Sequence, residues 1–244
     1  MKLKFIGNGS AFNVYRGNNC AYFIEDNKIL FLDFGENIFE RVLRRNLLKN
    51  IKEVYVAITH LHSDHVGSLP SFILYNYYVN GRKTNIVSAE KEKDNNLEMF
   101  LKLAGVGKQY FEFCQSNLNN SFNEIKLCEH TKVSHTEELD QYAITLHLTS
   151  NNKIYYSGDT NDVDYLKNIV QKLNNGDELY CDTCLEDYKN NVHMNFINLV
   201  KNVPENKRKQ VYCMHIDHDS LIETIQKLGF NFAESEEENI TTKQ

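Results

Sequence analysis

The sequence has few of the residues that interrupt a chain or link domains. Its 244 residues include two prolines, 11 glycines and no tryptophan, and no Gly/Ser-rich linker or internal repeat is present. At roughly 150 residues per domain the length falls between one domain and two, and α/β folds often use this much chain as one. We therefore predict a single domain over residues 1–230, followed by an acidic C-terminal tail over residues 231–244.

Long apolar runs are also absent. No segment approaches the roughly 18 to 20 apolar residues that a membrane span needs, and Asn8 and Gly9 interrupt the N-terminal run before a signal-peptide core can form. Six cysteines in a chain of this length do not indicate a disulfide scaffold, and we interpret the Cys181/Cys184 pair as core packing. These features predict a cytoplasmic protein with reduced cysteines and no membrane partner.

Positive charge does not dominate the sequence. There are 27 Lys and Arg residues against 33 Asp and Glu residues, a net charge of −6 with histidine neutral. Affinity for nucleic-acid phosphates comes from lysine and arginine, so this balance disfavours a protein whose main task is to hold nucleic acid. A local basic segment contains Lys201, Lys207, Arg208 and Lys209. A solvated loop is the simpler interpretation of it, and contact with a small phosphorylated ligand is the alternative.

Short β-type runs alternate with amphipathic helical patterns along the chain. The expected strands are 2–6, 20–24, 29–33, 54–58, 85–88, 125–128, 142–149, 153–157, 179–182 and 210–214. The expected helices are 38–48, 66–79, 90–103, 165–173 and 221–228. Two sheets with helices outside them would bury all of these apolar faces, so the predicted fold class is α/β.

The segment 59–67 carries the strongest chemical signal, because it directly follows the expected strand 54–58. Four of its residues, His60, His62, Asp64 and His65, can bind a metal. Residues two apart on an extended chain point the same way, so His60 and His62 can converge on one ion. Asp64 and His65 come where the chain turns into a helix, and they can face a second ion. A zinc ion takes three or four ligands, so this dinuclear site needs further ligands from elsewhere.

Three other residues can complete the site. His135, Asp159 and His215 each follow a β-type run, which would place them at strand ends. Any one of them alone would be interpreted as a surface or capping residue, but together with the cluster they form a ligand set. His218 is a weaker candidate that could instead face the substrate, and His130 is expected to be an ordinary strand residue.

In this order, the motifs resemble the metallo-β-lactamase superfamily over about residues 1–228. The motifs are a Gly-x-Gly-Ser turn at 7–10, Leu32-Asp33-Phe34-Gly35-Glu36, HxHxDH at 60–65, His135, Ser157-Gly158-Asp159-Thr160 and His215. The opening turn, the stretch 33–36 and His65-Val66-Gly67-Ser68-Leu69-Pro70 are most similar to the branch of ribonuclease Z and small phosphodiesterases. The resemblance implies a four-layer αββα sandwich with a dinuclear site between its sheets.

The resemblance also implies a role for each site residue. One metal would take His60, His62 and His135, the other would take Asp64, His65 and His215, and Asp159 would bridge them. Asp33 would support the metal-binding loop without binding metal. The catalytic residues would be Asp64, which orients the nucleophile, and the pair Asp182 and His193, which handles the leaving-group proton.

The implied activity is hydrolysis of a small or cyclic phosphodiester by a metal-bound hydroxide. Two divalent ions would serve as cofactors; zinc suits the mixed imidazole and carboxylate ligands, and manganese or iron are alternatives. The same metal site could instead serve an acyl hydrolase acting on a lactone, thioester or β-lactam. A redox enzyme with iron and a metal-binding scaffold without catalysis are the remaining alternatives.

The sequence departs from ribonuclease Z in one respect. Those enzymes hold tRNA with a long arm inserted after the motif that His135 matches, but only residues 136–158 separate His135 from Asp159. This spacing leaves no room for the arm and disfavours tRNA as a substrate. The expected partner is a small molecule or short nucleotide, and a homodimer is compatible with the sequence.

Overall fold

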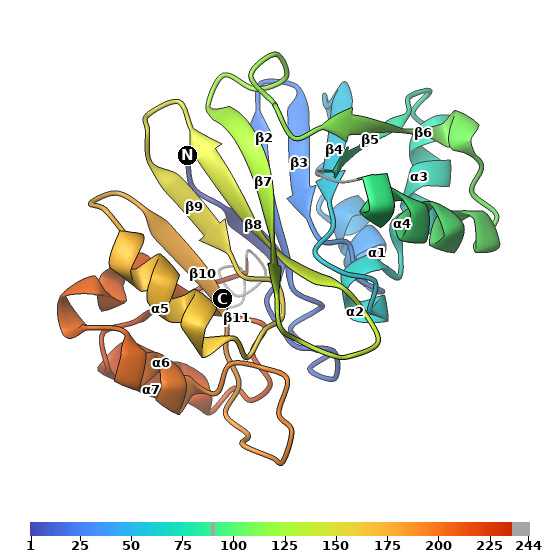
Figure 1. Cartoon of the computed structure of the whole chain (residues 1–244). Coiled ribbons are helices and arrows are strands. Elements are labelled where there is room, and N and C mark those ends of the chain that lie inside the picture. Colours follow the sequence, from blue (N-terminus) through green and yellow to red (C-terminus); the bar gives the residue numbers. More distant parts are fainter. Residues whose placement is uncertain (89–90, 236–244) are drawn as a thin grey trace, which may run out of the picture.

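Two mixed β-sheets pack face to face in the computed structural model, which describes residues 1–88 and 91–235 (Figure 1). The first sheet contains, in order, β1 (Lys4–Gly7), β2 (Cys20–Glu25), β3 (Lys28–Leu32), β4 (Glu53–Ala57), β5 (Thr84–Ser88) and β6 (Phe111–Gln115). The second contains β7 (Ile125–Val133), β8 (Gln141–Leu148), β9 (Lys153–Tyr156), β10 (Glu178–Asp182), β11 (Val211–Met214) and β12 (Asn231–Phe232). In each sheet the first three strands are antiparallel and the later strands add in parallel.

Helices cover the outer face of each sheet (Figure 1). The first sheet is covered by α1 (Ile38–Arg44), α3 (Leu69–Tyr78) and α4 (Lys91–Leu103), with the short α2 (Ser63–Val66) near its edge. The second is covered by α5 (Val163–Lys172), α6 (Phe196–Asn202) and α7 (Leu221–Lys227). Short 3₁₀ segments at Lys108–Tyr110 and Glu205–Gln210 precede β6 and β11. The arrangement confirms the predicted α/β class and its four αββα layers.

Strand alternation builds the three apolar cores between these layers. In β3, Ile29 and Phe31 pack under the helices, whereas Leu30 and Leu32 face the opposite sheet. In β9, Tyr156 faces the inter-sheet core. Because successive side chains of a strand point to opposite faces, each strand can bury apolar residues on both sides.

Two of the predicted helices are shorter than expected. The helix predicted over 38–48 ends at Arg44, because Asn46 and Asn50 adopt left-handed backbone angles that an α-helix cannot contain. The helix predicted over 66–79 is divided between α2 and α3. Pro70 lies in the first turn of α3, where its missing N–H costs no helical hydrogen bond.

The C-terminal boundary also differs from the prediction. Residues 231–235, assigned above to an acidic tail, belong to the domain because β12 pairs in parallel with β11. The Ala233 amide donates to the Cys213 carbonyl, and Asn8 Nδ2 donates to the Ala233 carbonyl at 2.7 Å. The rest of the predicted tail, residues 236–244, and Glu90 of the predicted helix 90–103 lie outside the described residues. None of the helices within the described ranges has the length and hydrophobicity of a transmembrane segment.

A close backbone contact joins the loop after β3 to α2. The Phe34 amide donates to the His65 carbonyl at 2.6 Å, and Ser68 Oγ donates to the Gly35 carbonyl. A Cβ atom on Gly35 would lie far inside van der Waals contact of the Asp64 carbonyl oxygen. Only glycine therefore lets this loop lie against the helix that carries Asp64 and His65.

We expect Gly35→Ala to lower the free energy of unfolding by about 1–3 kcal/mol, as overpacking of a buried contact does. Gly107→Ala is the matched control, since the nearest atoms there belong to the flexible end of the Gln109 side chain and can move aside. Urea unfolding of the two variants measures the difference. Equal losses of stability in both would contradict the proposed contact.

Candidate metal centre

The predicted site residues lie at the carboxyl ends of strands from both sheets. His60 follows β4, and His135 follows β7. Asp159 follows β9, Asp182 is the last residue of β10, and His215 follows β11. Carboxyl ends of neighbouring parallel strands open a crevice in α/β folds, and this position explains why residues distant in sequence converge.

The first cluster contains three histidines whose inward nitrogens face one another. His60 Nε2 lies 2.9 Å from His62 Nδ1, and His135 Nε2 lies 3.3 Å from the same atom. Nitrogens bound to one tetrahedral zinc at about 2.0–2.1 Å lie about 3.3 Å apart. These two distances are close to that value, and all three nitrogens lie within 4.8 Å of one another, so they can face a single ion.

The second cluster contains Asp64, His65, Asp159 and His215, all of them buried. Asp159 Oδ2 lies 3.1 Å from His65 Nε2 and 3.3 Å from His215 Nε2. Asp64 Oδ2 lies 3.3 Å from each of the same two nitrogens. Asp159 Oδ2 is also 4.0 Å from His60 Nε2, so this carboxylate lies between the two clusters.

Asp182 and His193 form a pair at the edge of the second cluster. His193 Nδ1 lies 2.8 Å from Asp182 Oδ2, while Asp182 Oδ1 lies 3.4 Å from His215 Nδ1. Asp182 is fully buried, but the side chain of His193 is 23% exposed. Asp182 therefore contacts both the buried His215 and the partly exposed His193, which lies on the solvent side of the site.

The outward nitrogens of three of these histidines also have partners. The pairs are His65 Nδ1 with Asp33 Oδ2 (2.9 Å), His135 Nδ1 with the Val192 carbonyl (3.1 Å) and His60 Nδ1 with Thr59 Oγ1 (3.0 Å). A histidine that donates through Nδ1 is left with a free lone pair on Nε2. These contacts fix the ring orientation and the tautomer that a metal ligand requires.

Asp33 holds the loop of the second cluster from behind. It is fully buried with φ of 64°, and it accepts hydrogen bonds from the Thr59 amide at 2.8 Å and from His65. The hydroxyl of Tyr156 donates to Asp33 Oδ2 at 3.2 Å, and Asn19 Nδ2 donates to that hydroxyl at 2.8 Å. Sequence analysis did not identify Tyr156 or Asn19, because neither has a local motif.

The Gly-x-Gly-Ser turn holds the segment that carries His215. His215 has φ of 58°, an unusual angle for a residue with a side chain. The next amide, that of Ile216, donates to the Asn8 carbonyl, and the Ser10 amide donates to the Ile216 carbonyl. Hydrogen bonds on both sides of Ile216 therefore hold the backbone in this conformation.

Electrostatics distinguishes the two clusters. Burial lowers the pKa of His60, His62 and His135, so these rings are neutral and available as ligands. Burial also acts to lower the pKa of His215, but the carboxylates of Asp159, Asp182 and Asp64 together outweigh it and raise that pKa to about 10.

The buried carboxylates of the second cluster depend on these imidazolium charges. Burial alone would raise the pKa of Asp64 and Asp159, but His65 and His215 beside them hold both pKa values below the usual range. Burial acts to lower the pKa of His65, and the carboxylates of Asp159 and Asp64 outweigh it and raise that pKa. Protons on the two histidines thus supply the positive charge that a bound cation would supply instead.

The donor set fits divalent metal ions. His65 Nε2, Asp159 Oδ1 and Asp182 Oδ1 are buried and have no hydrogen-bond partner among the described residues. Leaving such an atom unsatisfied costs about 1–3 kcal/mol, and coordination to a cation would remove that cost for the ligand atoms. Imidazole and carboxylate donors in this mixture suit zinc, manganese or iron.

The weaker sequence candidates lie elsewhere. The side chain of His218 is 52% exposed and its Nε2 lies 3.4 Å from Glu186, so it is not in the ligand clusters found among the described residues. Lys207 Nζ donates to the carbonyls of Val170 and Leu173, at the end of α5. Arg208 likewise donates to backbone carbonyls, so both side chains serve the local structure.

Comparison with known proteins confirms the superfamily. The family model described as anti-Pycsar protein Apyc1 matches residues 1–238. The chain is 26% identical over 235 residues to the anti-Pycsar protein Apyc1 of Bacillus phage BSP38, covering 88% of each chain. Among solved structures it is similar to the metallo-β-lactamase fold protein YhfI from Bacillus subtilis, with a TM-score of 0.67, 15% identity and coverage of 93% of this chain and 90% of that one.

The similar solved structures also include a member of the ribonuclease Z branch. The short form of human tRNase Z aligns with a TM-score of 0.66 and 15% identity, covering 96% of this chain and 97% of that one. At this identity the likeness shows the shared fold. The predicted resemblance to this branch of the superfamily is confirmed.

We expect Tyr156→Phe to reduce the free energy of unfolding by about 1–3 kcal/mol, because it removes a donor to Asp33 and leaves the buried Asn19 amide short of a partner. It should also weaken zinc binding by about tenfold. Mutating a residue that orients a metal ligand typically lowers metal affinity by about 10- to 100-fold, and this value is at the lower end of that range. Tyr180→Phe is the matched control: Tyr180 is the neighbour of Tyr156 across the sheet, but its hydroxyl donates to Glu178. Equal zinc affinities of the two variants, by isothermal titration calorimetry, would refute this assignment.

Proposed function

The chain belongs to the anti-Pycsar protein Apyc1 family and is a hydrolase of the metallo-β-lactamase fold, and we propose that it is a two-metal phosphodiesterase acting on a small or cyclic phosphodiester. One observation carries the proposal. Asp159 of the second cluster has its Oδ2 atom 4.0 Å from His60 Nε2 of the first cluster, and the Asp182–His193 pair adjoins the second cluster on the exposed side.

We assign each ligand to one of two metals. His60, His62 and His135 would hold the first ion, Asp64, His65 and His215 would hold the second, and Asp159 would contact both. Two bound divalent ions would lower the pKa of a water molecule and stabilise negative charge on the phosphate oxygens. Asp33, Thr59 and the Val192 carbonyl keep the histidines in the required orientation.

The protein groups then handle orientation and proton transfer. Asp64 would orient the attacking water, whose oxygen forms a bond to phosphorus while the ester P–O bond breaks. The departing alkoxide oxygen needs a proton, and His193 would donate it through Nε2 because its Nδ1 faces Asp182. Burial acts to lower the pKa of His193, but the Asp182 carboxylate outweighs it and raises that pKa, which keeps the ring protonated for this step.

Size and charge favour a small substrate. Residues 134–140 alone connect β7 to β8, so no long arm extends beside His135. A hollow next to His135 is lined by Glu137 and Asp162 and by Asp140, which forms an ion pair with Lys132 of the same lining. A polynucleotide carries one negative charge for each phosphate, whereas a cyclic nucleotide carries one in all. A cyclic nucleotide monophosphate therefore fits these surroundings better than a nucleic acid does.

We expect the purified protein to bind two equivalents of zinc and to hydrolyse bis(p-nitrophenyl) phosphate and 3′,5′-cyclic nucleotides. Chelation should abolish both activities, and added zinc or manganese should restore them. Metal analysis and product chromatography measure these results. Activity that survives chelation, or hydrolysis of a lactone, thioester or β-lactam faster than of any phosphodiester, would contradict the proposal.

We also expect His193→Ala to slow hydrolysis of a cyclic nucleotide by about 10²- to 10⁴-fold, because its alkoxide leaving group needs a proton. A p-nitrophenyl ester should lose less than about tenfold, since p-nitrophenolate leaves without protonation. His147→Ala is the control, because His147 pairs with Glu129 on the β7–β8 hairpin. Equal losses on both substrates would show that His193 is not the general acid.

A further inference from the structure

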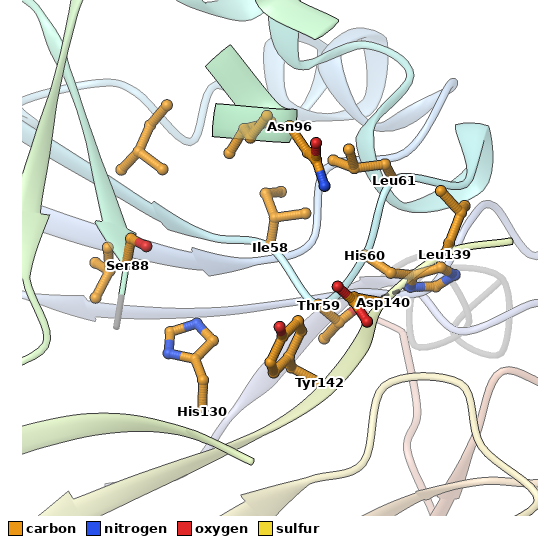
Figure 2. A pocket seen from close by; sticks show the side chains of 13 residues that line it. Ile58, Thr59, His60, Leu61, Ser88, Asn96, His130, Leu139, Asp140 and Tyr142 are labelled. Carbon is orange, nitrogen blue, oxygen red and sulfur yellow. Dashed lines mark hydrogen bonds between the residues drawn. The ribbon is translucent and has the colours of Figure 1, made fainter. Parts of the chain in front are cut away.

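A groove opens beside the metal centre at the carboxyl ends of β4 and β5. Figure 2 shows its lining: Leu61, Asn96, His130, Leu139 and Tyr142 surround it, and the His60 ring lies at one end. His60 belongs at the same time to the first ligand cluster. The groove therefore begins where the phosphate of a substrate would be held.

The loop that follows His135 forms one wall of this groove. Leu139 and Asp140 belong to the segment 134–140, so the wall and the ligand His135 are on one short connection. On the opposite side, Asn96 comes from α4 and its amide is directed toward the groove (Figure 2). The groove and the first ligand cluster therefore share His60, and the wall of the groove is on the connection that carries His135.

The groove combines apolar walls with a few polar groups. Ile58, Leu61 and Leu139 supply the apolar surface, while Asn96 and His130 supply hydrogen-bonding groups at the edge. An asparagine amide both donates and accepts, which suits a ring edge that carries donors and acceptors. Such a mixture is typical of small-molecule sites.

The volume limits what can enter. The cavity measures about 60 Å³, whereas a cavity that encloses a benzene ring measures about 150 Å³. The groove therefore takes the edge of a planar ring, and the rest of that ring stays outside. A flat heterocycle inserted edge-on meets the Asn96 amide while its faces contact the apolar walls.

We propose that this groove is the subsite for the heterocyclic base of a nucleotide substrate, with Asn96 as the residue that recognises the ring edge. The inference rests on the proposed phosphodiesterase function and extends it to the part of the substrate that does not react. It gives His130, expected to be an ordinary strand residue, a place beside the substrate.

Binding of phosphomonoesters to the zinc-loaded protein tests the subsite without any turnover. Cytidine 5′-monophosphate and adenosine 5′-monophosphate should bind at least tenfold more tightly than ribose 5-phosphate, which has the same phosphate but no base. Asn96→Leu, which keeps the size of the side chain, should remove most of that difference, and Asn96→Trp should remove it by filling the groove. Isothermal titration calorimetry measures all of these affinities.

The matched control is Asn95→Leu. Asn95 is the preceding residue of α4 and is exposed, as Asn96 is, but it does not line the groove, so the tenfold preference should persist in that variant. Equal affinities of the wild type for the nucleotides and for ribose 5-phosphate, binding of neither, or an unchanged preference in both Asn96 variants would overturn the subsite. Hydrolysis of bis(p-nitrophenyl) phosphate by the same preparations tests the proposed function separately.

Discussion

The structure depends on a concentration of buried carboxylates that requires positive charge. Asp33, Asp64, Asp159 and Asp182 are all buried within one region, and histidines are their close partners. A buried carboxylate without a counter-charge is strongly unfavourable. Either imidazolium protons or bound cations must therefore be present beside these carboxylates.

The sandwich supplies the rigid support for this arrangement. Ligands come from the carboxyl ends of strands in both sheets, and the polar contacts of Asn19, Tyr156 and Asp33 join the sheets beneath the site. Hydrogen bonds of this kind are stronger in a low-dielectric core than in water, and they restrict the positions of the side chains that make them. The same edge of the first sheet provides the groove beside His60, so metal binding and base recognition use one structural element.

Local motifs allowed much of the site to be predicted from sequence. The spacing of His60, His62, Asp64 and His65 after an apolar run indicates metal ligands on its own, and the family resemblance adds residues at the ends of later strands. The alternation of strand and helix patterns indicated two sheets with helices outside them, and the family resemblance implied the four-layer sandwich. These signals come from neighbouring residues in the sequence, or from motifs that follow one another in the same order as in the metallo-β-lactamase superfamily.

The features that sequence analysis missed depend on long-range packing. Tyr156 contacts Asp33 only because the two sheets face each other, and no pattern near Tyr156 marks that contact. The strand β12 was not predicted, because the acidic residues that follow it resemble a solvated tail. It forms because residues 231–232 pair with β11 at the edge of the second sheet, a contact that local sequence does not indicate. His130 lies in the strand β7, as predicted, but its position in the lining of the groove depends on α4, which is distant in sequence.

The most direct test of the central claim is a crystal structure of the zinc-loaded protein with anomalous diffraction at the zinc edge. Our account predicts two anomalous peaks about 3.5 to 4 Å apart, one among the three histidines and one beside Asp64, with Asp159 between them. A single peak, or a metal held by Asp182 and His193 in place of either cluster, would contradict it.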